Sequence, residues 1–266
     1  MKIGVLGPLV VEICGTSVVP TAAKPRQMLA LLAVNAGGDV KVTTLTEELW
    51  DASPPNGPAG VVQTYVKQLR RAIGLALGPE HECAPKDILS RSYAGYVLNL
   101  PKYAIDAEVF QQLTARGLRA LAGGEDAAAS SLLADALALW RGPALGDVPI
   151  GPALRVESLR LEETRRSALE GRITADLRLG RHAEVIAELL ALTERFPLEE
   201  KLHGLLMLAL YRSGRSWQAL EIFRKLRAST VAELGIEPSL RIQRLHREIL
   251  AADPRLDTAL PTLAPF

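Results

Sequence analysis

The side chains best able to do chemistry in this chain lie on one face of a helical stretch at 61–73, whose sequence is VVQTYVKQLRRAI. At 100° per residue, four apolar side chains fall within about 60° of one another and form a core stripe: Val62, Val66, Leu69 and Ile73. The remaining surface carries amides, a hydroxyl and cations, and no acid: Gln63, Thr64, Lys67, Gln68, Arg70 and Arg71. Gln, Lys and Thr can contact base edges in the DNA major groove, and arginines can hold phosphates.

The alternative for this face is an ordinary solvated surface. Exposed helices usually mix charges of both signs to gain i,i+4 pairs, as the segment LEETRRSALEGR at 161–172 does. The acid-free face therefore favours a negatively charged partner, provided that neighbouring elements present it.

Two helices are expected before this one. A helical period covers 24–36, and a short helix follows at 45–50. Thr43 and Thr44 can cap the short helix, with Glu47 three residues beyond Thr44 in a capping-box arrangement.

A loop and a hairpin complete the predicted module. The adjacent prolines in DASPPNGP at 51–58 exclude helix there, and helix resumes near residue 59. Strands at 88–92 and 96–100 are separated by a turn, which predicts a β-hairpin. Helix, short helix, loop, helix and hairpin make a winged helix-turn-helix, whose last helix enters the major groove. The hairpin supplies further candidates for contact with the DNA backbone: Ser90, Arg91 and Ser92.

The second half of the chain is nearly all helical from Asp106 onward. Gly180-Arg181 and Gly214-Arg215 stand 34 residues apart in similar phrases, which is the period of tetratricopeptide repeats. We therefore expect a mainly α protein with a small β part, in which an all-α tetratricopeptide-like domain follows the winged helix. The expected limits are 1–102 for the DNA-binding domain, 103–256 for the helical domain and 257–266 for a tail.

Composition limits the class of protein. The chain has 266 residues, 48% of them apolar, with 31 basic and 30 acidic side chains, which is a globular composition. Its apolar runs are too short to cross a bilayer. The first residues alternate like a strand, with Cys14-Gly15 as a turn before the next strand, and resemble no secretion signal. A reduced cytoplasmic setting, on the nucleoid, is expected.

Residues able to support catalysis are scattered. The four histidines (81, 182, 203 and 246) show no metal-ligand or nucleophile spacing, and Cys14 and Cys83 form no metal or disulfide pattern. We expect no enzyme activity, no catalytic residues, no cofactor and no metal.

Residues 1–102 hold 10 basic and 8 acidic side chains, so the DNA-binding domain is only weakly basic. One copy should bind DNA modestly, and two copies side by side would bind more tightly. The low net charge also leaves open a helical-repeat adaptor whose winged helix binds protein.

The order of phrases along the chain resembles the Streptomyces antibiotic regulatory protein family of transcriptional activators. The matching phrases cover nearly all of 1–256: VLGPLVV, KPRQMLALL, LTEELW, QTYVKQLRRAI, GYVLNL, ALALWRGPALGDV, RLEETRRSALEGRITADLRLGRH, PLEEKLHGLLMLALYRSGR and AELGIEP. Such proteins join an OmpR-type winged helix to a bacterial transcriptional activation domain. The chain has no G-x-x-x-x-G-K-[ST] phosphate loop, which larger family members carry in a nucleotide-hydrolysing module, so it resembles a small form.

The resemblance implies that the protein binds tandem direct repeats near promoters of secondary-metabolite (antibiotic) gene clusters and recruits RNA polymerase holoenzyme, including its sigma factor. It implies base contacts from Gln63, Thr64, Lys67 and Gln68, although relatives have Arg at several of these positions. It also implies that Arg70 contacts the DNA backbone and that Arg91 lies on the wing. The loop 51–58 corresponds to the segment that touches polymerase in OmpR-type activators, and its candidate contacts are Asp51, Ser53 and Asn56.

Overall fold

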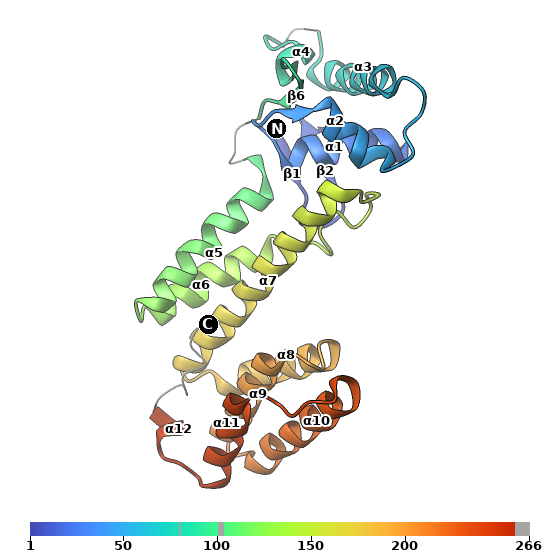
Figure 1. Cartoon of the computed structure of the whole chain (residues 1–266). Helices are drawn as coiled ribbons and strands as arrows, with labels where there is room; N and C mark the ends of the chain where they lie inside the picture. Colours follow the sequence, from blue (N-terminus) through green and yellow to red (C-terminus); the bar gives the residue numbers. More distant parts are fainter. Residues whose placement is uncertain (80, 101–103, 259–266) are drawn as a thin grey trace. The chain divides into compact units, whose positions relative to one another are not determined.

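The computed structural model describes residues 1–79, 81–100 and 104–258, which form helices and two small sheets (Figure 1). They divide into two compact units, one within residues 1–116 and 134–168 and one within 117–133 and 169–258. The strands are β1 Lys2–Gly4, β2 Val10–Ile13, β3 Thr16–Ser17, β4 Val40–Lys41, β5 Leu89–Arg91 and β6 Gly95–Leu98. The helices are α1 Ala23–Val34, α2 Val42–Trp50, α3 Pro58–Leu77, α4 Pro85–Ile88, α5 Asp106–Ala122, α6 Asp126–Ala138, α7 Pro152–Arg178, α8 His182–Arg195, α9 Glu200–Arg212, α10 Ser216–Leu234, α11 Leu240–Leu250 and α12 Arg255–Thr258.

The first sheet is antiparallel in the order β1-β2-β3, as the sequence indicated. Ile3 pairs with Val11, and the β2–β3 turn places Cys14 and Gly15 at positive φ, 49° and 78°. The opening stretch makes two strands because the chain turns back between them, where Gly7 adopts a φ of 148°.

The second sheet, in the order β4-β6-β5, contains the predicted hairpin and one strand, β4, that the sequence did not predict. β4 has two residues, paired through Val40 with Tyr96, and it leads into α2 without an intervening loop. The capping-box prediction for α2 was therefore wrong. Lys41 occupies the N-cap position without a side-chain cap, and Thr43 and Thr44 lie inside the first turn.

The predicted helix positions are confirmed for α1 and α3 within a few residues. α3 begins with Pro58 in the first turn, where a missing N–H costs nothing, and packs on α1, α2 and α4 (Figure 1). This packing anchors one side of α3 and leaves the other side for contact.

The helical second half repeats one turn geometry. Gly124, Gly180 and Gly214 each have φ between 73° and 79° and each stand between consecutive helices. After each glycine, the next backbone N–H donates to a carbonyl five residues earlier: Glu125 to Ala120, Arg181 to Asp176 and Arg215 to Leu210, all at 2.9 Å. This is the Schellman closure of a helix, which needs a left-handed residue. The 34-residue period of the sequence marks two of these turns.

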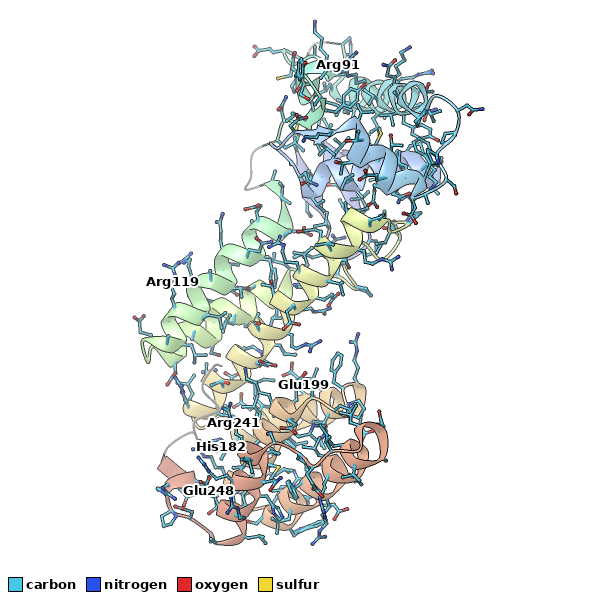
Figure 2. The ribbon with its side chains drawn as sticks, in the orientation of Figure 1. Arg91, Arg119, His182, Glu199, Arg241 and Glu248 are labelled. Carbon is cyan, nitrogen blue, oxygen red and sulfur yellow. The ribbon has the colours of Figure 1, made fainter. Side chains whose placement is uncertain are left out.

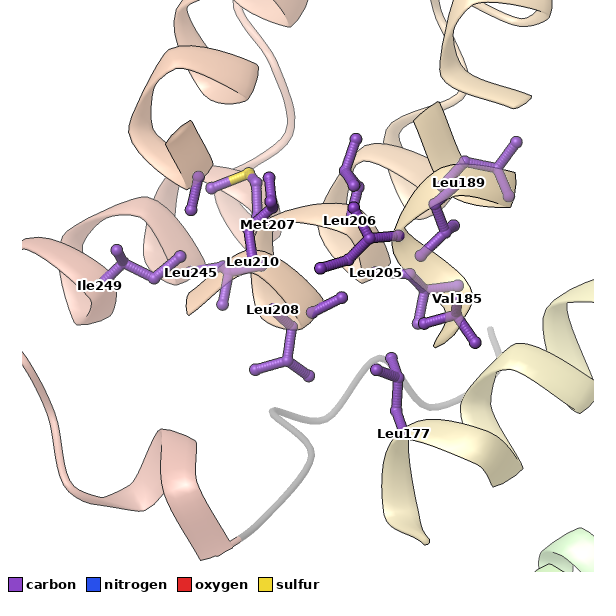
Figure 3. Close-up of a cluster of buried hydrophobic side chains, with 14 of the residues drawn as sticks. Leu177, Val185, Leu189, Leu205, Leu206, Met207, Leu208, Leu210, Leu245 and Ile249 are labelled. Atoms are coloured by element: carbon purple, nitrogen blue, oxygen red, sulfur yellow. The ribbon is translucent and has the colours of Figure 1, made fainter. Parts of the chain in front are cut away.

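α9 is the central helix of the second unit. Each residue from Leu202 to Leu210 is buried, so α9 is enclosed on all sides, and all of these residues except His203 are apolar or glycine. Leu205 and Leu206 pack with Val185 of α8, and Leu245 of α11 belongs to the same cluster (Figure 3). Phe223 of α10 is also buried there.

In the first unit, part of the helical half is attached to the amino-terminal segment. The backbone N–H of Arg141 donates to the carbonyl of Leu6 at 2.7 Å, and that of Leu145 donates to Val5 at 3.0 Å. Asp106 accepts from the backbone N–H groups of Val5 and Leu6 at 2.8 and 3.2 Å. The predicted boundary at 102/103 falls outside the described residues, as does most of the predicted tail, so those limits stay predictions.

No helix within the described ranges is both long enough and apolar enough to cross a membrane.

Candidate nucleic-acid interface

The apolar stripe of α3 is buried as the sequence predicted. Val62, Val66, Leu69 and Ile73 are 0–2% exposed. Burying one stripe fixes the rotation of the helix, so the opposite face must point to solvent. The side chains that lie exposed there are Gln63, Thr64, Lys67, Gln68 and Arg71.

Thr64 is partly committed to its own helix. Its hydroxyl donates to the carbonyl of Gly60 at 3.0 Å, the back-bonding that threonine makes within helices. The methyl group and the oxygen lone pairs remain available, so Thr64 can offer an apolar surface to a thymine methyl or accept a hydrogen bond.

Arg70 has a different environment from Arg71. Its side chain is half-buried, and its Nε and Nη2 donate to the carbonyl of Leu89 at 2.9 and 2.8 Å. Leu89 begins β5, so Arg70 joins the candidate recognition helix to the wing. The sequence predicted phosphate contact for Arg70 but not this bracing role, since the partner carbonyl lies 19 residues away.

Two of the predicted wing residues shape the hairpin. The Ser92 hydroxyl donates to Asp39 Oδ1 at 2.6 Å and accepts from the backbone N–H of Gly95 at 2.8 Å. Ser90 Oγ accepts from Asn99 Nδ2 at 2.9 Å. Both serines are half-buried; Ser92 bonds within the turn of the wing, and Ser90 joins β5 to the residue that follows β6.

The exposed end of the wing carries Arg91 and Tyr93. Arg91 is exposed and labelled in Figure 2, and Tyr93 is fully exposed, at 106%. Tyr93 falls in the predicted turn between the strands at 88–92 and 96–100, and no contact was predicted for it. Its place between two strands was the signal that could have identified it, because a tyrosine at a hairpin tip has no core to enter and can hydrogen-bond phosphate.

The loop between α2 and α3 is exposed from residue 51 to 57, including Asp51, Ser53 and Asn56. Asp51 ends α2 with a φ of 52°, a conformation that non-glycine residues rarely adopt. On the helix side of the loop, the rings of Trp50 and Tyr65 stack with centroids 6.4 Å apart. The loop therefore starts from a fixed point on α2 and α3.

Three histidines in the helical half of the chain are buried or half-buried. His203 lies in α9 with its Nδ1 3.0 Å from the carbonyl of Glu199, and burial lowers its pKa. Burial also lowers the pKa of His182 and of His246, which stacks on Phe223 at 4.0 Å. The described residues contain no group of three or more His, Cys, Asp or Glu side chains placed to hold a metal ion.

Comparisons with known proteins match this chain to transcriptional regulators. Residues 105–250 match the family model for the bacterial transcriptional activator domain. The chain is 49% identical to the regulatory protein DnrI of Streptomyces peucetius, over 97% of this chain and 94% of DnrI. It is 36% identical to the transcriptional regulator RedD of Streptomyces coelicolor, over 96% of this chain and 72% of RedD. A solved structure of Mycobacterium tuberculosis EmbR in complex with a low-affinity phosphopeptide superposes with a TM-score of 0.87 at 33% identity, covering 97% of this chain and 68% of EmbR.

Proposed function

The chain belongs to the Streptomyces antibiotic regulatory protein family of transcriptional regulators, and we propose that it activates a secondary-metabolite gene cluster by binding DNA through α3 and the wing. The observation that carries the proposal is the exposed, acid-free face of α3 beside an exposed arginine and tyrosine on the wing. A helix of 20 residues is about 30 Å long and fits a major groove.

The residues on α3 divide by position along the helix. Gln63, Thr64 and Lys67 lie in its first half, where recognition helices contact base edges, and Gln68 follows directly after the midpoint. Arg71 follows on the exposed face and contacts phosphate in this proposal. Arg70 contributes to the phosphate contact through the part of its guanidinium that does not bind Leu89.

The wing supplies contacts beyond the major groove. Arg91 and Tyr93 are exposed on the wing, and both residue types bind phosphate oxygens. Ser90 and Ser92 complete the proposed contact set and hold the hairpin in place through their hydrogen bonds.

Two protomers bind side by side on tandem direct repeats. A weakly basic domain neutralises few phosphates, so one copy binds modestly and pairing raises the affinity. Repeats on one face of the DNA are then spaced by roughly one helical turn, 10–11 base pairs. The site of action is the nucleoid in the cytoplasm, and no cofactor takes part.

The loop with Asp51, Ser53 and Asn56 faces RNA polymerase holoenzyme, including the sigma factor. It is exposed, it is anchored at α2, and it lies outside the proposed DNA-contacting face. The helical domain adds surface for the polymerase and for the second protomer.

Protection of the promoter region upstream of the neighbouring gene cluster tests this function. We expect the purified chain to protect two direct repeats and to raise transcription from that promoter with polymerase holoenzyme. A chain that washes through heparin and random DNA at low salt would instead be a protein-binding adaptor, the alternative that its low net charge allows.

A further inference from the structure

Glu48 is a buried carboxylate, 2% exposed, in the last turn of α2. It makes no ion pair among the described residues. A buried charge is costly unless hydrogen bonds replace its hydration. Four N–H groups do so here: its Oε1 accepts from Gly151 N at 2.7 Å and Gln27 Nε2 at 3.0 Å, and its Oε2 accepts from Ala153 N at 2.8 Å and Leu154 N at 3.1 Å.

These bonds close the first turn of α7. A helix leaves its first backbone N–H groups without internal partners, and a capping side chain usually satisfies some of them. Pro152 has no N–H, Ala153 and Leu154 donate to Glu48, and Arg155 donates to the carbonyl of Gly151 at 3.0 Å. Glu48 thus caps α7 from another helix, and its charge faces the positive end of a 27-residue helix dipole.

The approach of the two segments needs a glycine. A Cβ at Gly151 would lie 2.2 Å from the Glu48 carbonyl oxygen and 2.7 Å from Glu48 Cδ. Because both neighbours belong to the same packed turn, α2 and the start of α7 would have to separate to admit any side chain.

The same turn of α2 sets the start of the 51–57 loop. Gln27 of α1 donates to the Glu48 carbonyl at 2.7 Å, and Lys24 Nζ donates to the carbonyl of Leu49. Trp50 then stacks on Tyr65 of α3, and Asp51 begins the loop. The position of the loop therefore depends on a turn that α7 holds through Glu48.

We propose that Glu48 is a positioning residue that couples the helical activation domain to the loop at 51–57. The proposal rests on the proposed function, because it takes that loop as the polymerase-facing segment. The apolar stripe of α3 is buried and α3 also packs on α1 and α4, so we expect its DNA contact to survive loss of the Glu48 cap, whereas the orientation of the loop should not. Loss of the cap should therefore reduce activation while leaving DNA binding in place.

The test compares E48Q with E47Q in the full chain. Glu47 precedes Glu48 in the same helix but is exposed, so the control removes the same charge from solvent. In E48Q the side chain keeps its size, but an NH₂ group opposes backbone donors that had an acceptor. We expect E48Q to bind the promoter within about twofold of wild type and to lower saturated transcript yield by about five- to 150-fold, the usual range of coupling between sites. E47Q should match wild type in both measurements.

G151A disrupts the same contact from the α7 side. Like E48Q, it should keep its DNA affinity and lose transcript yield. Full activation by E48Q and G151A would overturn the proposal. Loss of DNA binding in both variants would also overturn it, because the cap would then serve folding of the winged helix. Failure of wild type and E47Q to activate transcription would refute the proposed function itself rather than the role of Glu48.

Discussion

Arg70 and Arg71 are adjacent in sequence and have different environments, so comparing their substitutions isolates the bracing that Arg70 adds to its proposed phosphate contact. In R70A the chain loses the two hydrogen bonds that join α3 to the carbonyl of Leu89, at 2.9 and 2.8 Å. In R71A an exposed side chain is removed and no hydrogen bond between α3 and the wing changes. The two variants remove the same charge one residue apart.

Hydrogen bonds to charged groups contribute about 1.5–3 kcal/mol in net terms, and the half-exposed setting of Arg70 reduces this. We therefore expect R70A to lower the free energy of unfolding by about 1–2 kcal/mol, which shifts the thermal midpoint by roughly 2–8 °C in a chain of this size. R71A should change it by less than about 0.5 kcal/mol, as surface substitutions usually do.

Nonspecific DNA affinity should fall more in R71A than in R70A, the reverse of their order in stability, because Arg71 is exposed and Arg70 is half-buried. R71A should weaken binding to specific and random DNA alike and reduce the slope of log affinity against log salt by about 0.9, the value for one phosphate contact. Thermal denaturation of both variants measures the change in stability, and gel shifts at several salt concentrations measure the salt slope. Equal thermal midpoints for R70A and R71A would refute the bracing role, and an unaltered salt slope for R71A would refute its phosphate contact.

Three further predictions concern other parts of the molecule. K67A should weaken specific promoter binding by about 1–3 kcal/mol in gel shifts if Lys67 contacts a base, and K225A, which removes an exposed lysine of α10, should not. Because burial lowers the pKa of His203, the folded state binds a proton on this side chain less readily than the unfolded state does. The free energy of unfolding should therefore fall as pH drops below about 6.5. H203N should make this fall shallower in urea denaturation measured across pH. G180A should cost about 1 kcal/mol in the same denaturation, since alanine is strained at a φ of 79°, whereas G60A, in open space on α3, should cost nothing or stabilise the helix.

Local patterns in the sequence predicted much of the fold. The spacing of Val62, Val66, Leu69 and Ile73 identified the buried side of α3, because 3.6 residues per helical turn place these four side chains on one face. The prolines of the 51–57 loop marked where helix had to stop. The spacing between Gly180 and Gly214 identified equivalent turns between helices.

Contacts between distant segments could not be predicted in the same way. Strand β4 has two residues and no pattern of its own; it is a strand because Val40 meets Tyr96. Arg70 had the residue type of a phosphate ligand, and only the nearby carbonyl of Leu89 revealed its bracing role. Tyr93 gained importance only once its exposure at the wing tip was visible.

The sequence by itself determined which face of α3 is apolar and which is free of acid, since both follow from residue order on a helix of known pitch. It could not determine what Glu48 does, because Glu47 and Glu48 are chemically identical neighbours. Tertiary structure decided between them: Glu47 points to water, while Glu48 meets the first N–H groups of a helix that begins more than a hundred residues later. A hydrogen bond depends on distance and direction between groups, and the chain acquires those only on folding.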